Sequence, residues 1–137
     1  MNYYINQSDF GCQVHVDNMY CASKNNQNYR TAFWTGQHLQ LTLMSIPVCD
    51  EIGLEIHNET DQYIRIEEGY GYVMVGKEQC QMNEWQLCTG EAVFIPAGMW
   101  HNIINIGNCP LKLTSVYGPP RHPFGTIHTT KEEAHKK

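Results

Sequence analysis

The stretch Gly-Glu-Ala-Val-Phe-Ile-Pro-Ala-Gly-Met-Trp-His-Asn-Ile-Ile-Asn, residues 90–105, decides the fold. Its residues 93–95 form a short apolar run with the β-branched and aromatic bias of a strand. Pro96 ends that strand because proline cannot donate to a sheet, and Gly98 permits the tight turn that follows. A second strand begins at Trp100 and carries His101 near the turn. The pattern therefore predicts two strands joined by a Pro-Gly turn, with an imidazole beside it.

A second informative stretch, residues 53–69, lies upstream and contains several polar side chains. Side chains of an extended chain alternate between its two faces, so Glu55 and His57 are expected to point to the same side. After a polar turn the alternation resumes at Gln62, whose face then becomes apolar. We therefore expect Glu55, His57 and Gln62 on one inner wall, with His101 opposite.

The downstream stretch resembles the second signature motif of the cupin family. That motif reads G-x5-P-x-G-x2-H-x3-N, and every specified position is matched, by Gly90, Pro96, Gly98, His101 and Asn105. The resemblance extends over roughly residues 39–117. It implies an all-β fold, the double-stranded β-helix or jelly-roll barrel, with a divalent metal near the wider mouth.

The first cupin motif, G-x5-H-x-H-x3,4-E-x6-G, is matched only in part. His57 takes its second histidine and Gly69 its last glycine. Glu55 stands at the first histidine, Gln62 at the glutamate and Cys49 at the opening glycine. The departures leave the identity and the occupancy of the metal open.

Four residues are the candidate metal ligands: Glu55, His57, Gln62 and His101. Two imidazoles, a carboxylate and an amide oxygen suit a borderline divalent cation such as Zn, Fe, Mn, Ni or Co. The set is similar to the zinc site of type I mannose-6-phosphate isomerases, with the Glu and Gln positions exchanged. Two alternatives stay open: a strand histidine is often a hydrogen-bonded structural residue, and Gln62 can orient a water instead of binding the metal.

Composition excludes several classes of function. A chain of 137 residues is long enough for one domain with a real core. Its net charge of −5 excludes the basic footprint of a nucleic-acid-binding protein. No apolar run is long enough to span a bilayer, and the first residues lack the basic and apolar segments of a secretory signal. We therefore expect a cytoplasmic protein with no membrane or nucleic-acid partner.

Three regions are expected along the chain. Residues 1–28, rich in Asn, Gln, Ser and Tyr, predict an irregular N-terminal arm, residues 29–120 the barrel, and residues 121–137 a C-terminal extension that ends in a short helix capped by Thr130. In the barrel, Leu39, Leu41 and Leu43 alternate with Gln40, Thr42 and Met44, which predicts a half-buried strand with a mildly polar second face.

Several other polar residues receive simpler assignments. Arg65 is expected to form a surface ion pair and Glu67 to be solvated. His122 and His128 are expected on the surface by default, with folding over the barrel mouth as the alternative for either. The six cysteines form no Cys-x-x-Cys pair, so we expect free thiols, mostly buried as small apolar side chains.

The resulting functional hypothesis is a metal-dependent cupin acting on a sugar, a sugar phosphate or a similar small oxygenated molecule. Isomerase chemistry, as in mannose-6-phosphate isomerases, is the first reaction type considered, although no separate general base stands out. The alternatives are a non-enzymatic barrel that binds or senses a small ligand, and a metal-dependent dioxygenase. A homodimer is also expected, because small cupins commonly associate and the aromatic residues of the arm need a surface.

Overall fold

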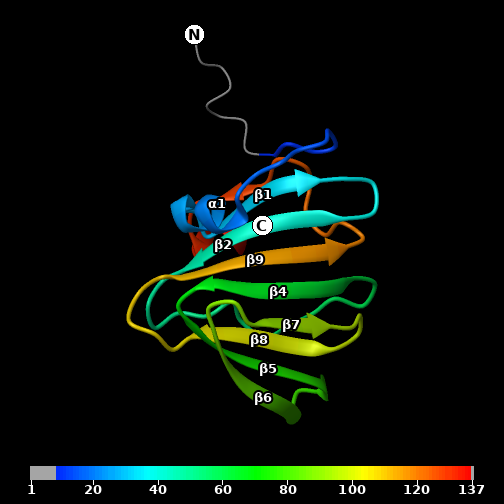
Figure 1. Ribbon diagram of the computed structural model, residues 1–137. Helices are drawn as coiled ribbons and strands as arrows, with labels where there is room; N and C mark the ends of the chain where they lie inside the picture. The colour runs from blue at the N-terminus through cyan, green and yellow to red at the C-terminus, as the bar shows by residue number, and fades with distance from the viewer. Residues whose placement is uncertain (1–8, 137) are drawn as a thin grey trace.

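Two antiparallel sheets face each other in the computed structural model, which describes residues 9–136 (Figure 1). The larger sheet has the strand order β10-β1-β2-β9-β4-β7, and the smaller one β3-β8-β5-β6. The strands are β1 (Arg30–Thr35), β2 (Gln40–Ile46), β3 (Glu55–Ile56), β4 (Asp61–Glu68), β5 (Tyr70–Glu78), β6 (Gln81–Cys88), β7 (Ala92–Ile95), β8 (Trp100–Asn105), β9 (Leu111–Gly118) and β10 (Ile127–His128). This arrangement confirms the predicted all-β double-stranded β-helix.

The apolar core lies between the two sheets. Alternate residues of each strand point inward, so the core collects one face from every central strand. Burial of each such side chain stabilises the fold by about 1.5–3 kcal/mol. Its members include Ile46 of β2, Ile64 and Ile66 of β4, Val73 and Val75 of β5, Ile103 of β8, and Leu111 and Leu113 of β9.

One end of the barrel interior is polar rather than apolar. Gln40 and Thr42, the mildly polar face predicted for β2, are fully buried. They pair across the sheet with Tyr117 and Ser115 of β9, which are also buried. The leucine at position 41 lies on the outer face and is partly exposed. The interior therefore has an apolar half and a polar half, and the polar half is where a site can form.

The N-terminal arm contains a short helix that the sequence did not predict. Helix α1 (Met19–Asn25) begins at Asn18, whose side chain accepts a hydrogen bond from the Cys21 amide (3.0 Å). It lies against the outer face of the larger sheet, where Lys112 donates to the Asn26 carbonyl. Seven residues give too little periodicity to reveal a helix. Residues 1–8 of the predicted arm lie outside the described residues.

Glu67 is buried, so its prediction as a solvated residue was wrong. It is 4% exposed and accepts a hydrogen bond from Thr114 Oγ1 (2.8 Å). Arg65 Nε lies 3.2 Å from its Oε2, which gives Arg65 the expected ion pair. The register of β4 shifts between Ile66 and Glu68, and α1 packs nearby on β4. Alternation correctly puts Glu67 on the outer face with Arg65, but it does not anticipate that α1 packs against this part of the sheet.

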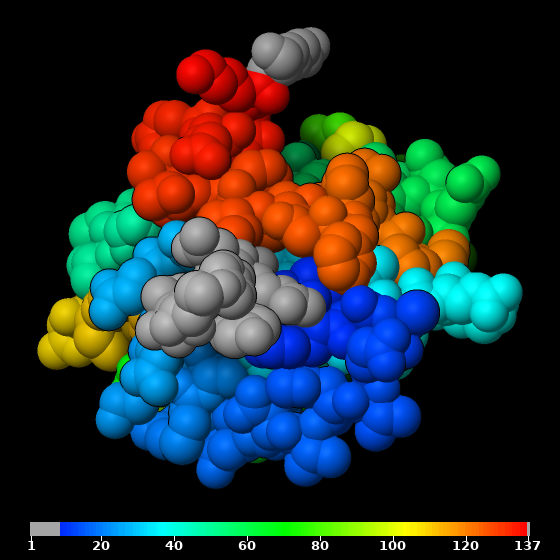
Figure 2. All heavy atoms as spheres, turned by 90° about the horizontal axis from the view of Figure 1, so that it is seen from above, coloured from blue at the N-terminus to red at the C-terminus, as the bar shows by residue number. Residues whose placement is uncertain are grey.

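The C-terminal extension returns across the end of the barrel. Strand β10 pairs with β1, and α2 (Lys131–Ala134) follows it. The Thr130 side chain accepts a hydrogen bond from the Glu133 amide (3.1 Å), as the predicted helix cap requires. Figure 2 shows this extension, in orange and red, side by side with the arm in blue. None of the helices in residues 9–136 is long and apolar enough to cross a membrane.

Asp9 connects the N-terminal arm to the C-terminal extension through hydrogen bonds. Its carboxylate is 1% exposed and accepts hydrogen bonds from the Thr35 amide (2.9 Å) and the Thr35 hydroxyl (2.6 Å). It also accepts one from the Gly125 amide (2.9 Å). A carboxylate so placed replaces lost hydration with several hydrogen bonds. The beginning and the end of the described chain are thereby fixed to the same strand, β1.

All six cysteines are free thiols, as expected, but they are not buried. Cys109 is half-buried, and the other five are exposed. The expectation of buried thiols was therefore wrong. The cysteines lie in the arm, in loops and turns or on the solvent-facing strand β6, where the alternation of a core strand does not apply.

Asn105, the last residue of the second motif, is expected to act on stability. Its Nδ2 donates to the carbonyls of Ile46, Pro47 and Cys109, and its Oδ1 accepts from the Gly107 amide. An Asn105→Ala substitution should lower the free energy of unfolding by about 2–3 kcal/mol, because buried backbone groups lose their partners. Urea denaturation monitored by circular dichroism measures this change.

The matched control is Asn83→Ala on β6, where the asparagine is exposed. It should change the free energy of unfolding by less than about 0.5 kcal/mol. Equal stabilities of the two variants would contradict the structural role of Asn105.

Candidate metal centre

Strand pairing brings two of the four candidate ligands together. Glu55 of β3 is directly opposite His101 of β8 in the antiparallel register. Directly opposite residues of such a pair have Cβ atoms about 4.5–5.5 Å apart, which is within reach of their side chains. His57 follows β3 and is held by its carbonyl, which accepts a hydrogen bond from the Gly98 amide (2.9 Å). Gly98 has a φ of +85°, so the predicted tight turn requires a glycine there.

Glu55, His57 and His101 form one cluster. Glu55 Oε1 lies 3.3 Å from His57 Nε2 and 3.5 Å from His101 Nε2. One ligand atom from each residue lies within 4.8 Å of the others. His57 is 9% exposed and His101 3% exposed. Two imidazole nitrogens and a carboxylate oxygen at these separations can converge on one cation.

The donor atoms of this cluster lack hydrogen-bond partners. Among the described residues, His57 Nε2, His101 Nε2 and Gln62 Oε1 are buried without one. Leaving such an atom unsatisfied costs about 1–3 kcal/mol, and the two histidine nitrogens belong to one cluster. A divalent cation would satisfy nitrogen and oxygen donors of this kind. The residues present therefore fit the metal that the fold implies.

Gln62 lies on the inner face of β4 and is 4% exposed. Its Nε2 donates to Ser115 Oγ (2.8 Å), which fixes the amide and leaves Oε1 as the open acceptor. The orientation agrees with a ligand role and equally with the alternative of orienting a water. Its role as a fourth ligand stays a prediction.

The two histidines differ in the nitrogen that carries a proton. His101 Nδ1 lies 3.1 Å from the Met99 carbonyl, so it donates and leaves the Nε2 lone pair free. His57 Nδ1 instead accepts a hydrogen bond from Arg121 Nε (3.0 Å). A guanidinium can only donate, so the neutral His57 ring here carries its proton on Nε2. His101 is thus ready to bind a cation, whereas His57 must first lose its contact with Arg121.

Glu55 is ionised in this environment. Burial raises the pKa of its carboxyl, but the adjoining imidazoles of His101 and His57 outweigh burial and hold that pKa well below its usual range. An ionised carboxylate is the form that binds a metal. Together with a divalent cation it leaves a charge of about +1 at the centre.

The C-terminal extension supplies residues that the sequence analysis missed. Gln40 Oε1 accepts from the Arg121 and His122 amides (3.0 and 2.9 Å), and its Nε2 donates to the His122 carbonyl (2.8 Å). His122 is therefore held over the barrel, with its ring 5.3 Å from that of Tyr117. His122 therefore takes the alternative position over the barrel mouth and not the default surface position. His128, paired to Arg30 at 3.3 Å, is also only partly exposed. The sequence gives no signal for this contact, because the burial of the Gln40 amide is visible only in the folded barrel.

A double-stranded β-helix with two imidazoles and a carboxylate at one end defines a class of small barrels that can bind metals and ligands inside. The chain belongs to the cupin family, because the family model for the cupin domain matches residues 42–117. This confirms the resemblance inferred from the two motifs.

Similar proteins occur in bacteria and in a virus. The chain is 50% identical to YrkC of Bacillus subtilis over 127 residues, which cover 92% of this chain and 68% of YrkC. It is 39% identical to a protein of Acanthamoeba polyphaga mimivirus over 123 residues, 89% of this chain and 76% of that protein. The crystal structure of BH2720 from Bacillus halodurans superposes with a TM-score of 0.91 at 49% identity, covering 93% and 97% of the two chains.

Removal of the Arg121 guanidinium should strengthen metal binding. Arg121→Gln is expected to raise the affinity for Zn²⁺ about tenfold, because it removes a positive charge and frees His57 Nδ1 to carry the proton. Competition with a chromogenic chelator measures the Zn²⁺ affinity.

The control is Lys77→Gln, which removes an exposed positive charge on β5 and should leave Zn²⁺ affinity unchanged. Weaker Zn²⁺ binding by Arg121→Gln would show that Arg121 supports the centre instead of competing with it.

Proposed function

We propose that this cupin is a metal-dependent enzyme that acts on a small oxygenated molecule. Glu55, His57 and His101 would hold the divalent ion, with Gln62 as the fourth ligand. The observation that carries the proposal is the group of buried donor atoms without hydrogen-bond partners around one carboxylate. A divalent ion at this position supplies Lewis-acid polarisation of a ligand oxygen.

The surrounding residues have separate tasks in this proposal. Glu55 compensates one positive charge and leaves the rest for an incoming oxygen. Ser115 fixes the Gln62 amide through its 2.8 Å hydrogen bond. Tyr117 is 1% exposed, with its ring 6.0 Å from that of His57, and closes the inner wall against water. A dry wall strengthens the electrostatic interactions of the bound molecule.

The size of the cavity beside the cluster favours a small substrate. It has a volume of about 160 Å³ and is bounded by Glu55 and His57 on one side and by Arg121, His122 and His135 on the other. Pockets for larger metabolites usually measure about 300–1,000 Å³. In this cavity a sugar phosphate is therefore supported less well than a smaller oxygenated molecule, whereas a second cavity that His57 and Arg121 also line measures about 430 Å³.

Two reaction classes remain in the proposal. Isomerisation needs a group that moves a proton, and His135 at the cavity edge is the residue proposed for it. His122 is less suitable, because burial and the charges of Arg30 and Arg121 lower its pKa to about 3. The second candidate is a dioxygenase, which is favoured by the set of two histidines and one carboxylate. If the barrel is not an enzyme, it would bind the same molecules without converting them.

Metal content tests the centre directly. The protein purified without added metal should carry close to one divalent ion per chain by elemental analysis, and His57→Ala and His101→Ala should each lose nearly all of it. Gln62→Ala should keep the ion with about tenfold lower affinity, because three donors remain. Equal trace metal in the wild type and in both histidine variants would refute the centre.

The control for these variants is His38→Ala. His38 is exposed and lies outside the cluster, so its removal should leave the metal content unchanged. Thermal unfolding of each variant distinguishes loss of a ligand from loss of the fold.

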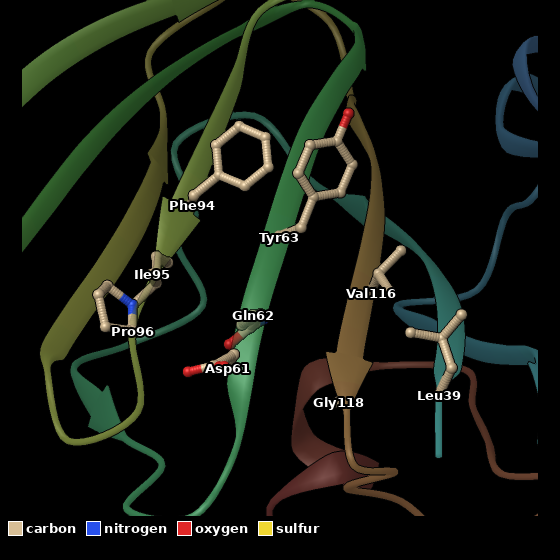
Figure 3. Close-up of a pocket in the computed structure, with 9 residues that line it drawn as sticks. All are labelled: Leu39, Asp61, Gln62, Tyr63, Phe94, Ile95, Pro96, Val116 and Gly118. Atoms are coloured by element: carbon tan, nitrogen blue, oxygen red, sulfur yellow. The ribbon is translucent and has the colours of Figure 1, made fainter. Parts of the chain in front are cut away.

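The outer face of the larger sheet supports the expected homodimer. The Phe94 and Tyr63 rings lie 4.8 Å apart there, and Leu39 and Val116 continue the apolar surface (Figure 3). Phe94 is 76% exposed and Leu39 48% exposed. Two copies of a chain with a net charge of −5 repel each other, so a mainly apolar face is where they can meet. We propose that a second copy of the chain covers this face.

Phe94→Glu should convert the dimer into a monomer, because it places a charge in the centre of the proposed interface. Sedimentation velocity in the presence of a reducing agent measures the assembly. Trp85→Glu, on the exposed strand β6, should leave the dimer intact. A wild-type protein that sediments as a monomer would contradict the proposal.

A further inference from the structure

The cavity next to the candidate centre has a strongly cationic wall. Its lining comes from the start of β1, the segment around β3 and the C-terminal extension, namely Tyr29, Arg30, Ile52, Glu55, His57, Arg121, His122, Ala134 and His135. Two arginines face a single carboxylate, which itself belongs to the metal cluster. The cavity therefore has one more positive charge than negative charge before any cation is counted.

Arg30 is buried without a carboxylate partner. It is 7% exposed and is opposite the buried Met44 of β2, so it faces the barrel interior. Its Nη1 contacts His128 Nδ1 at 3.3 Å, and its Nε is buried without a hydrogen-bond partner. Within residues 9–136 no aspartate or glutamate lies at ion-pair distance from it. A buried guanidinium in this state is costly unless an anion joins it.

Tyr29 adds a neutral donor to the same wall. Its side chain is 2% exposed, and its hydroxyl is buried with no hydrogen-bond partner. Burial raises the pKa of this hydroxyl to about 12, so it keeps its proton at neutral pH. The Arg30 guanidinium lies 5.3 Å from the centre of the Tyr29 ring. Two neighbouring side chains thus each have a donor without an acceptor, an N–H of Arg30 and the O–H of Tyr29.

We propose that this cavity binds a small organic carboxylate. Its carboxylate group pairs with the Arg30 guanidinium and accepts from the Tyr29 hydroxyl, and its other end points to the cluster of Glu55, His57 and His101. This inference rests on the proposed function, because it assigns that substrate to a class of compound.

Shape and lining support a carboxylate over other anions. A guanidinium presents parallel N–H donors that match the planar carboxylate group. Ile52 and Ala134 give the cavity an apolar portion that a carbon skeleton can contact and an inorganic anion cannot. A volume of about 160 Å³ is below the roughly 300–1,000 Å³ usual for larger ligands, which favours a small acid of a few carbons.

Arg121 links this anion site to the metal. In the structure its Nε donates to His57 Nδ1 (3.0 Å). When His57 Nε2 binds a cation, Nδ1 carries the proton and no longer accepts this hydrogen bond. Arg121 then lacks its partner and becomes available to the carboxylate. Metal and carboxylate should each raise the affinity for the other, by the same factor.

The test uses pyruvate, together with pyruvamide as a neutral analogue of nearly the same shape and phosphate as an inorganic anion. Isothermal titration calorimetry is run on the full chain, metal-free and loaded with Zn²⁺. Pyruvate should bind at least tenfold more tightly than either pyruvamide or phosphate, and Zn²⁺ should strengthen pyruvate binding about tenfold. Equal affinities for pyruvate and pyruvamide would overturn the carboxylate site. An effect of Zn²⁺ smaller than twofold would overturn the coupling.

Two arginine variants locate the site. Arg30→Gln should weaken pyruvate binding about ten- to a hundredfold, and Arg121→Gln should abolish the effect of Zn²⁺ on it. Arg121 is exposed, so its variant is expected to fold even if Arg30→Gln does not. Lys77→Gln is the control and should bind pyruvate like the wild type. Unchanged pyruvate binding and unchanged coupling in Arg121→Gln would refute the inference.

The design separates this inference from the metal proposal. If the protein binds no Zn²⁺ but pyruvate binding depends on Arg30, the carboxylate site stands and the metal-dependent function fails. If Zn²⁺ binds through the histidines but pyruvate does not bind, the carboxylate site fails and the metal centre stands.

Discussion

The pairing of β3 with β8 is the constraint on which the candidate site depends. It sets Glu55 opposite His101, and a shift by one residue would turn both side chains to the other face. A strand of only two residues cannot hold such a register alone. The neighbouring backbone is therefore fixed on both sides, by Asn102 Oδ1 accepting from the Gly53 amide (2.9 Å) and by the Gly98 amide donating to His57. Rigid support of this kind is what a metal centre needs.

The barrel separates stability from chemistry along its interior. Its apolar half contains the isoleucines, leucines and valines of the central strands, and burial of these side chains supplies the free energy of folding. Its polar half contains buried groups that make folding less favourable when they have no partners, such as Arg30, Tyr29 and the two histidine Nε2 atoms. A protein tolerates such groups when a ligand supplies the hydrogen-bond or ion partners that they lack. The two halves together explain why the unsatisfied atoms gather at one end.

The sequence predicted the parts of the site that depend on local pattern. The second motif fixed His101 and its turn, and the spacing of Glu55 and His57 placed them on one side of a short extended segment. It did not predict contacts across long separations, such as that of Arg121 with His57, 64 residues apart. Nor did it show that Gln40 would be buried, because an amide among leucines looks like a solvent-facing residue. Only the closed barrel shows which face is inside.

The hydrogen bonds of Asp9 with Thr35 and Gly125 have a consequence for how the protein can be engineered. The extension that carries Arg121 is held by a carboxylate 116 residues earlier, through the Gly125 amide. Shortening the chain past Asp9 would therefore loosen the opposite end of the polypeptide, although the removed residues belong to none of the strands that carry the candidate ligands. Fusion partners and truncations at the amino end should accordingly be checked for their effect on ligand affinity at the C-terminal extension.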